Sequence, residues 1–300
     1  MKYINNYLEY LKINKKYSEN TILSYKDDIL EFYDVVDKNV TNIDEDKVRI
    51  YLTYLYDKKF NRNSISRKLS GVRSFYNYLY NNDIVNKNYF KDIRNPKKLK
   101  GLPHYLKEDE IDKLFDIPDI NTPLGQRNLL IIEMLYATGV RVSELVNIKV
   151  KDIDKYNDSI KIMGKGSKER IVYFGSFCKN SLEMYLDDGR RILNTKGSEY
   201  LFLNKNGYRL SDRMIRNILD DLILKAGVDK HASPHMIRHT FATDMLNSGA
   251  DLMTVKELLG HENIDTTSIY THVTDEQIRR IYDNCHPRAK ERWEKWLKQN

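Results

Sequence analysis

A basic segment without carboxylates separates the chain into two parts of different character. Between Asp92 and Glu108 there is no acidic residue, and Pro96, Gly101 and Pro103 punctuate the stretch. The basic residues in it are Arg94, Lys97, Lys98, Lys100 and Lys107. This composition predicts an exposed linker over residues 95–106, between a domain at 1–94 and a domain at 107–300. Whether its charge serves a polyanionic partner or only solvates a connector stays open.

Residues 1–94 carry helical patterns and no strand signal. After Tyr17-Ser18-Glu19-Asn20, apolar residues recur with a period near 3.6 from Ile22 to Val36. Further helices are expected from about Glu45 to Tyr56 and from about Ser64 to Tyr80. The last of these presents Ser64, Arg67, Lys68 and Gly71 along one side. We therefore expect a small helical bundle with a basic face.

Residues 107–300 combine helices with a β-hairpin. Helices are expected from about Glu108 to Phe115 and from Leu124 to Tyr136, and the second is apolar nearly all round, which predicts that it is buried. Two β-rich runs, 159–163 and 170–174, flank residues 164–169, so a hairpin is predicted. Its loop resembles a phosphate-binding loop only superficially, because Gly166 follows Lys165 where Ser or Thr is needed. A solvated hairpin tip is the alternative to a functional one.

Composition limits the class of protein. The formal net charge of +7 favours a polyanionic partner such as nucleic acid, although a bias towards Asn, Ile and Lys accounts for part of it. Cys178 and Cys285 form no CxxC pair, so neither a zinc ribbon nor a disulfide framework is indicated. The N-terminus has no apolar core of signal-peptide length, and Glu133 interrupts the most apolar run. We expect a cytoplasmic protein without a membrane span.

An arginine follows the predicted buried helix at a turn. Thr138-Gly139 ends that helix, and Arg141 lies where the next one begins. The free N–H groups of a helix N-terminus and a guanidinium group together make an anion pocket. Arg141 is therefore a candidate anion-binding residue. A surface ion pair between Arg141 and Glu144 is the alternative.

A cationic cluster follows Ser233-Pro234, a pair that is typical of a helix start. His235, Arg238 and His239 are spaced i, i+3 and i+4, so they share one helical face. Zinc binding by the two histidines with His261 is an alternative, but an arginine between the ligands would repel the metal and no HExxH pattern is present. Another alternative is that His239 is simply buried and hydrogen-bonded.

Together these positions resemble the tyrosine recombinase (phage integrase) family. In that family an arginine, a hairpin lysine, a His-x-x-Arg, a second histidine and a nucleophilic tyrosine recur in this order. The matching residues are Arg141, Lys165, His235, Arg238, His261 and Tyr270. The stretch YSENTILSYKDDILEF looks like the family's N-terminal core-binding helices, and YTHVTDEQIRRIYDNCHPRA looks like the tail of its Xer branch.

The resemblance implies a mainly α fold. Residues 1–94 would form a helical, SAM-like core-binding domain, 95–106 the linker, and 107–300 an α+β catalytic domain of the type shared with type IB topoisomerases, with a small β-hairpin or sheet. A tail from about 285 to 300 would contact a neighbouring subunit. The candidate DNA contacts are Ser64, Arg67, Lys68, Lys97, Lys98, Lys100, Lys168 and Arg170.

The resemblance also implies site-specific recombination of DNA through a 3′-phosphotyrosyl intermediate. Tyr270 would attack phosphorus, and Arg141 and Arg238 would clamp the non-bridging oxygens. Lys165 would protonate the departing 5′-oxygen, His235 would handle the tyrosine's proton, and His261 would hydrogen-bond the phosphate. The phosphoester is stored on the enzyme, so no cofactor, metal or ATP is expected.

The implied partners are a double-stranded DNA recombination site and, on that DNA, a homo- or heterotetramer with a Xer paralogue. Resolution of chromosome or plasmid dimers during chromosome partition and cell division would follow, with a septal DNA translocase as a further partner. Three alternatives stay open: an integrase of a mobile element with the same chemistry, a metal-dependent nuclease or hydrolase that uses the three histidines, and a DNA-binding regulator without catalysis. The DNA target sequence is not legible.

Overall fold

The chain divides into two compact units, residues 1–101 and 102–300. The computed structural model describes residues 1–36, 39, 41–96, 105–164, 169–228, 233–260 and 274–289. Each unit has a hydrophobic core of its own, and the division falls inside the segment predicted as a linker. The roles assigned to the two parts stay predictions. Among the helices of the described residues, none is both long and apolar enough to cross a lipid bilayer.

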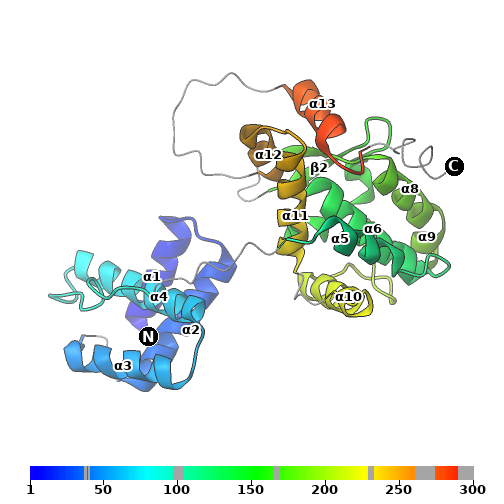
Figure 1. Cartoon of the computed structure of the whole chain (residues 1–300). Coiled ribbons are helices and arrows are strands. Elements are labelled where there is room, and N and C mark those ends of the chain that lie inside the picture. Colours follow the sequence, from blue (N-terminus) through cyan, green and yellow to red (C-terminus); the bar gives the residue numbers. More distant parts are fainter. Residues whose placement is uncertain are drawn as a thin grey trace. The chain divides into compact units, whose positions relative to one another are not determined.

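The N-terminal unit is a helical bundle, as predicted (Figure 1). Ser18 caps the second helix by accepting the N–H of Thr21. Aromatic rings fill the core, and the centroids of Phe32 and Tyr51 lie 4.9 Å apart in an edge-on contact. Its helices in the described residues are α1 (Lys2–Ile13), α2 (Glu19–Val35), α3 (Glu45–Asp57) and α4 (Arg62–Asn81).

The C-terminal unit is mainly helical. Its helices in the described residues are α5 (Glu108–Asp116), α6 (Pro123–Thr138), α7 (Val142–Leu145), α8 (Ser176–Met184), α9 (Arg190–Leu193), α10 (Asp212–Lys225), α11 (Pro234–Asn247), α12 (Leu252–Leu259) and α13 (Asp275–Cys285). A 3₁₀ turn covers Val150–Asp152, and a π-helical turn, Tyr185–Gly189, joins α8 to α9. Helix α6 is buried along nearly its whole length, which confirms the prediction, and Figure 1 shows it between α11 and α8.

A small antiparallel sheet lies in the same unit, with the strand order β1 (Ile153–Asp154), β2 (Ser159–Met163) and β3 (Glu169–Tyr173). Strands β2 and β3 confirm the predicted hairpin, and Ile162 pairs with Arg170 across it. Its turn, residues 165–168, is outside the described residues. Strand β1 was not predicted, because two residues are too few to show a period of two.

The last described residues are anchored on α6. Arg288 forms an ion pair with Glu133, whose side chain is 2% exposed. The Arg288 guanidinium packs 4.0 Å from the ring centroids of both Phe115 and Phe177. The glutamate that interrupts the most apolar run of the sequence is thus matched by a cation 155 residues later. This anchor holds the segment after α13 against the core of the C-terminal unit.

Candidate active site

Arg141 lies at the N-terminus of α7, directly after the turn that ends α6. Gly139 ends α6 with a φ of 60°, and an added Cβ would lie 2.6 Å from the ring of Phe241, so the turn needs glycine. The Arg141 N–H donates to Glu144 Oε2 at 2.8 Å, and its Nη1 donates to Oε1 at 2.9 Å. The ion pair weighed as an alternative is therefore present. The Glu144 side chain is only 5% exposed, so this is not a surface pair.

Arg141 also reaches the end of a second helix. Its Nη2 donates to the main-chain carbonyl of Gly260 at 3.2 Å. Gly260 ends α12 in the left-handed conformation, with a φ of 63°. The next residue along the chain is His261, which lies outside the described residues. The arginine side chain is 39% exposed and is accessible to a ligand.

Arg238 approaches the same place from α11. This helix begins as predicted, because Ser233 caps it by accepting the N–H of Met236. The Arg238 Nη2 donates to the carbonyl of Leu259 at 2.7 Å, and Nη1 donates to the carbonyl of Gly139. Arg141 and Arg238, 97 positions apart in the printed sequence, therefore bind the carbonyls of two adjacent residues. The structure brings this predicted pair together.

Arg238 is buried, with 6% of its surface exposed. Burial, together with the charge of nearby Arg141, lowers its pKa to about 10. The guanidinium stays protonated at neutral pH, because that value is still well above 7. Arg238 is therefore a buried cation whose hydrogen bonds go to main-chain carbonyls. The oxygen atoms of a phosphate can take the place of these carbonyls as acceptors.

A third guanidinium completes the group. Arg170 on β3 donates to both carboxylate oxygens of Glu144, at 2.9 and 2.8 Å. We call Arg141, Arg170, Arg238 and Glu144 the arginine cluster. Its three cations exceed its one carboxylate, and the partial negative charge at the C-terminus of α12 offsets only part of the difference. The arrangement is suited to bind an anion.

The geometry of Arg170 departs from the expectation that it contacts DNA. Its side chain is 15% exposed and points at a buried carboxylate. The sequence held a signal for this orientation, because Arg170 and buried Val172 are two apart on one strand and so share a face. Glu144 was considered only as the partner in a surface pair, and its contact with Arg170 was missed.

The histidines of α11 lie differently from one of the expectations. His235 and His239 are both exposed, and Arg238 between them is buried. The interpretation of His239 as a buried residue is therefore wrong, and its ring centroid lies 6.5 Å from that of Tyr105. In the part of the chain that the structure describes, no three His, Cys, Asp or Glu side chains are grouped so as to hold a metal. His261 lies outside that part, so the zinc alternative is not tested.

Several predicted site residues lie outside the described residues, and their roles stay predictions. They are the catalytic candidates Lys165, His261 and Tyr270 and the DNA-contact candidates Lys97, Lys98, Lys100 and Lys168.

The remaining DNA-contact candidates lie on α4. Lys68 is less accessible than a DNA contact requires, because its side chain is 8% exposed and its ammonium group is paired with Glu31 and lies 3.6 Å from Asp28. Arg67 also forms an ion pair with Asp28, but its side chain is 46% exposed. Ser64 is partly exposed in the first turn of α4. Arg67 and Ser64 remain candidates for a DNA contact, whereas Lys68 is occupied in the packing of α4 on α2.

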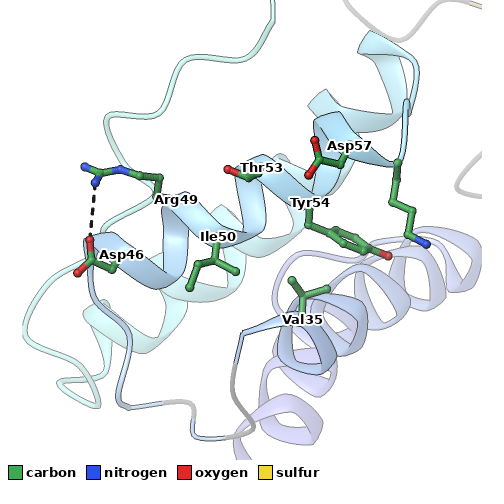
Figure 2. Close-up of a pocket in the computed structure, with 8 residues that line it drawn as sticks. Val35, Asp46, Arg49, Ile50, Thr53, Tyr54 and Asp57 are labelled. Carbon is green, nitrogen blue, oxygen red and sulfur yellow. Dashed lines mark ion pairs between the residues drawn. The ribbon is translucent and has the colours of Figure 1, made fainter.

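A groove beside α3 in the N-terminal unit contains none of the predicted site residues. Figure 2 shows Arg49 and Asp46 at one end of it, with their nearest charged atoms 3.7 Å apart. Both side chains are largely exposed, so this pair contributes little to stability. Its other lining residues are Val35, Ile50, Thr53, Tyr54, Asp57 and Lys58. No group of converging donors marks this groove as a site.

Both units match known sequence families. Residues 104–287 match the Phage integrase family, and residues 4–83 match the Phage integrase, N-terminal SAM-like domain. A protein named Tyrosine recombinase XerC from Anoxybacillus flavithermus is 46% identical over 293 residues, which cover 95% of this chain and 98% of that protein. The protein of the same name from Bacillus subtilis is 43% identical over 290 residues, covering 94% of this chain and 95% of that protein.

Solved structures show the same fold. XerH site-specific recombinase bound to difH substrate, in a pre-cleavage complex, has a TM-score of 0.65 and 26% identity, covering 87% of this chain and 78% of that chain. A lambda integrase fragment bound to a core site has a TM-score of 0.71, with 91% of this chain and 98% of that chain covered. At 16% identity the second similarity concerns the fold alone.

Proposed function

The chain belongs to the phage integrase family and is a site-specific tyrosine recombinase of the Xer type, and we propose that the arginine cluster is the part of its active site that holds the scissile phosphate. The reaction cuts and rejoins DNA strands through a 3′-phosphotyrosyl intermediate. The observation that carries the proposal is the convergence of Arg141 and Arg238 on the end of α12, one residue before His261.

In the proposed reaction the phenolic oxygen of Tyr270 forms a bond to the scissile phosphorus while the bond from phosphorus to the 5′-oxygen breaks. The proton of the phenol passes to His235, and a proton from Lys165 goes to the departing 5′-oxygen. A 5′-hydroxyl of the cleaved strand in the partner duplex then forms a bond to phosphorus and gives its proton to Lys165, while the bond from phosphorus to Tyr270 breaks and His235 returns a proton to the phenolic oxygen. Each step exchanges one phosphoester for another, so no external energy source is consumed.

The two guanidinium groups act on the transition state. The pentavalent phosphorus carries more negative charge on its non-bridging oxygens than the diester does. Arg141 and Arg238 offer donors to those oxygens from fixed positions, which costs little reorganisation during the reaction. Main-chain carbonyls hold both groups in place before DNA arrives.

The proposal is tested by trapping the covalent intermediate. The substrate is DNA recovered by cross-linking the protein in cells, nicked near the cleavage point so that the short cleaved strand diffuses away. The wild type is expected to form a complex that resists denaturation by detergent, in the presence of a chelator as well as without one. Tyr270→Phe is expected to form none, because it lacks the nucleophilic oxygen.

Tyr208→Phe is the matched control, because Tyr208 is 59% exposed and is not a predicted site residue. It should trap as much DNA as the wild type. A covalent complex with Tyr270→Phe would overturn the nucleophile assignment. Loss of cleavage on chelation would favour the metal-dependent nuclease instead.

We further propose that the chain works in the cytoplasm on a duplex recombination site, in a four-subunit assembly with a second Xer recombinase. Relatives named Tyrosine recombinase XerC over nearly the whole chain support this role. The tail from about residue 285 to 300 would contact the neighbouring subunit, and a septal DNA translocase would regulate the assembly. Removing the residues after Ala289 is expected to impair synapsis of two DNA sites more than binding to one site. A fully active truncation would contradict the proposed contact.

A further inference from the structure

Arg170 links three parts of the catalytic unit that are far apart in the sequence. It lies on β3, which follows residues 165–168, the predicted hairpin turn that includes Lys165. Its guanidinium donates to Glu144 through Nη1 and Nη2, at 2.9 and 2.8 Å. Its Nε donates to the carbonyl of Leu258 on α12, at 3.4 Å. All three nitrogen atoms therefore face acceptors of the protein, which is the geometry of a structural link.

The link to Glu144 bears on Arg141. Both oxygens of the Glu144 carboxylate accept from Arg170, and the same two oxygens accept from the main chain and side chain of Arg141. Burial alone would raise the pKa of Glu144, but the hydrogen bonds from Arg170 and Arg141 outweigh it and hold the pKa below its usual value. The carboxylate is ionised at neutral pH and shared between the two guanidinium groups.

The link to α12 concerns the residues just before His261. A Cβ at Gly260 would lie 3.1 Å from three atoms of the Arg170 side chain, Cδ, Nε and Cζ. Such a contact is tighter than ordinary packing, so the guanidinium and the glycine main chain are closely apposed. The position of the α12 terminus is therefore set by Arg170 together with Arg141 and Arg238, which bind its last carbonyls.

We propose that Arg170 is a positioning residue of the recombination reaction: it holds Glu144, which orients Arg141, and it fixes the end of α12 against the phosphate site. The proposal rests on the proposed function and deepens it. Arg170 touches no reacting atom in this assignment. Its effect on the rate passes through the placement of Arg141, and a displacement of about 1 Å at such a site costs on the order of 100-fold.

The test uses the full chain and a nicked trapping duplex, with binding and cleavage measured separately. Arg170→Met is expected to bind the duplex within about twofold of the wild type and to lower the single-turnover cleavage rate by about 100-fold. Arg170→Lys is expected to be nearly as slow, because an ammonium group cannot make the two parallel bonds to Glu144. Lys161→Met is the matched control, since it removes an exposed cation from the neighbouring strand, and it should cleave at the wild-type rate.

Salt dependence separates this role from a DNA contact. Removing a phosphate contact lowers the slope of log affinity against log salt by about 1. Arg170→Met is expected to keep the wild-type slope. A reduced slope together with an unchanged cleavage rate would overturn the proposal and restore Arg170 as a DNA contact. Arg170→Lys with full activity would overturn it too.

A second substrate distinguishes the clamp from the hairpin lysine. If sulfur replaces the bridging 5′-oxygen, the leaving thiolate needs no proton. A variant that is slow only because proton donation by Lys165 is impaired should therefore cleave this substrate at the wild-type rate. Because Arg170 acts through Arg141, the slow cleavage by Arg170→Met should persist on this substrate. Full recovery would show that Arg170 acts only through the lysine hairpin, against the proposal.

A double-mutant cycle with Glu144→Gln tests the shared carboxylate. The two changes break one ion pair, so their combined effect on the cleavage rate should be smaller than the product of the separate effects. Independent, multiplicative effects would overturn the link through Glu144. Failure of the proposed function itself has a different signature, because the wild type would then form no covalent complex.

Discussion

The two units of the chain treat buried positive charge in opposite ways. In the N-terminal unit, Arg67 and Lys68 on α4 face Asp28 and Glu31 on α2, so cations and carboxylates are equal in number. The arginine cluster has three guanidinium groups and one carboxylate, which pairs with Arg141 and Arg170, whereas Arg238 binds main-chain carbonyls. Main-chain carbonyls accept the other hydrogen bonds that hold those groups.

The difference decides which of the two clusters is suited to a phosphate. A phosphate that takes a cation away from a buried carboxylate leaves a negative charge without its partner, which costs several kcal/mol. A phosphate that takes a cation away from a carbonyl leaves a neutral polar group, which costs roughly 1–3 kcal/mol at most. The arginine cluster is therefore prepared for exchange with a ligand. Arg67, Lys68, Asp28 and Glu31, which we call the α2–α4 cluster, serve instead to hold two helices together.

The largest expected effect breaks the clamp itself. Arg238→Ala removes a guanidinium whose hydrogen-bond partners among the described residues are the carbonyls of Gly139 and Leu259. We expect the single-turnover cleavage rate to fall by about 100- to 1000-fold, which is about 3–4 kcal/mol of transition-state stabilisation. The yield of covalent complex against time gives the rate. DNA affinity should change much less, because one phosphate contact among many is lost.

Arg209→Ala is the control for Arg238→Ala. Arg209 is an exposed arginine of the same unit that packs on the ring of Tyr200, and its removal should leave cleavage unchanged. Circular dichroism of both variants checks that they fold. A cleavage rate for Arg238→Ala within threefold of the wild type would mean that the cluster does not clamp the phosphate.

The next effect concerns stability and belongs to the other cluster. Asp28→Ala removes the whole carboxyl group, which is 1% exposed and accepts a hydrogen bond from Arg67. We expect it to lower the free energy of unfolding of the N-terminal unit by about 2 kcal/mol, the usual worth of a hydrogen bond to a charged group. Urea denaturation measures the loss, and hydrogen exchange in α2 and α4 assigns it to this unit.

Asp46→Ala provides the comparison, because the pair of Asp46 with Arg49 is exposed and loose (Figure 2). Its effect on stability should lie within experimental error. If the two substitutions lower the free energy of unfolding equally, burial of the α2–α4 cluster does not increase its contribution to stability.

Local signals predicted most of the fold. The helices could be found because apolar period and capping are properties of neighbouring residues, as with Ser18 before α2, Gly139 after α6 and Ser233 before α11. Charge partners could not be found in this way. The partners Glu144 and Arg170 are 26 positions apart, and nothing in the sequence says which helix end packs on which strand.

Two candidate DNA contacts, Lys68 and Arg170, are largely buried in ion pairs, for a reason that the sequence contains. Lys68 follows Ile65 by three residues and precedes Val72 by four, which places it on the buried face of α4, whereas the side chain of neighbouring Arg67 is 46% exposed. Arg170 shares a strand face with Val172. In both cases the predicted DNA contact rested on the positive charge of the residue, whereas its position in the periodic pattern indicates a buried side chain. The resemblance of an ordered residue set, by contrast, placed Arg141 and Arg238 together correctly.

The smallest expected effect contrasts the two buried carboxylates through pH. Burial raises the pKa of Asp28 above its ordinary value of 3.8, and the hydrogen bond from Arg67 and the charge of Lys68 only partly oppose it. Burial acts on Glu144 too, but hydrogen bonds from Arg170 and Arg141 bring its pKa below the ordinary value of 4.5. Glu144 accepts four hydrogen bonds from these two arginines, which accounts for the opposite direction.

The two groups should therefore respond to acid with opposite signs. Below pH 4.5 the unfolded chain binds a proton at Glu144 before the folded chain does, so the stability that this carboxylate contributes is present at neutral pH and is lost as the pH falls through its folded pKa. Above pH 3.8 the folded chain binds a proton at Asp28 before the unfolded chain does, so stability rises as the pH falls through that window and is level below it. The free energy of unfolding in urea is measured between pH 7 and 3 for the wild type, Glu144→Gln and Asp28→Asn. The difference between the wild type and each variant at a given pH isolates the contribution of that carboxylate, because the other titrating groups cancel. If both stability differences rise, or both fall, as the pH is lowered, the pKa values of Asp28 and Glu144 are shifted in the same direction, against this prediction.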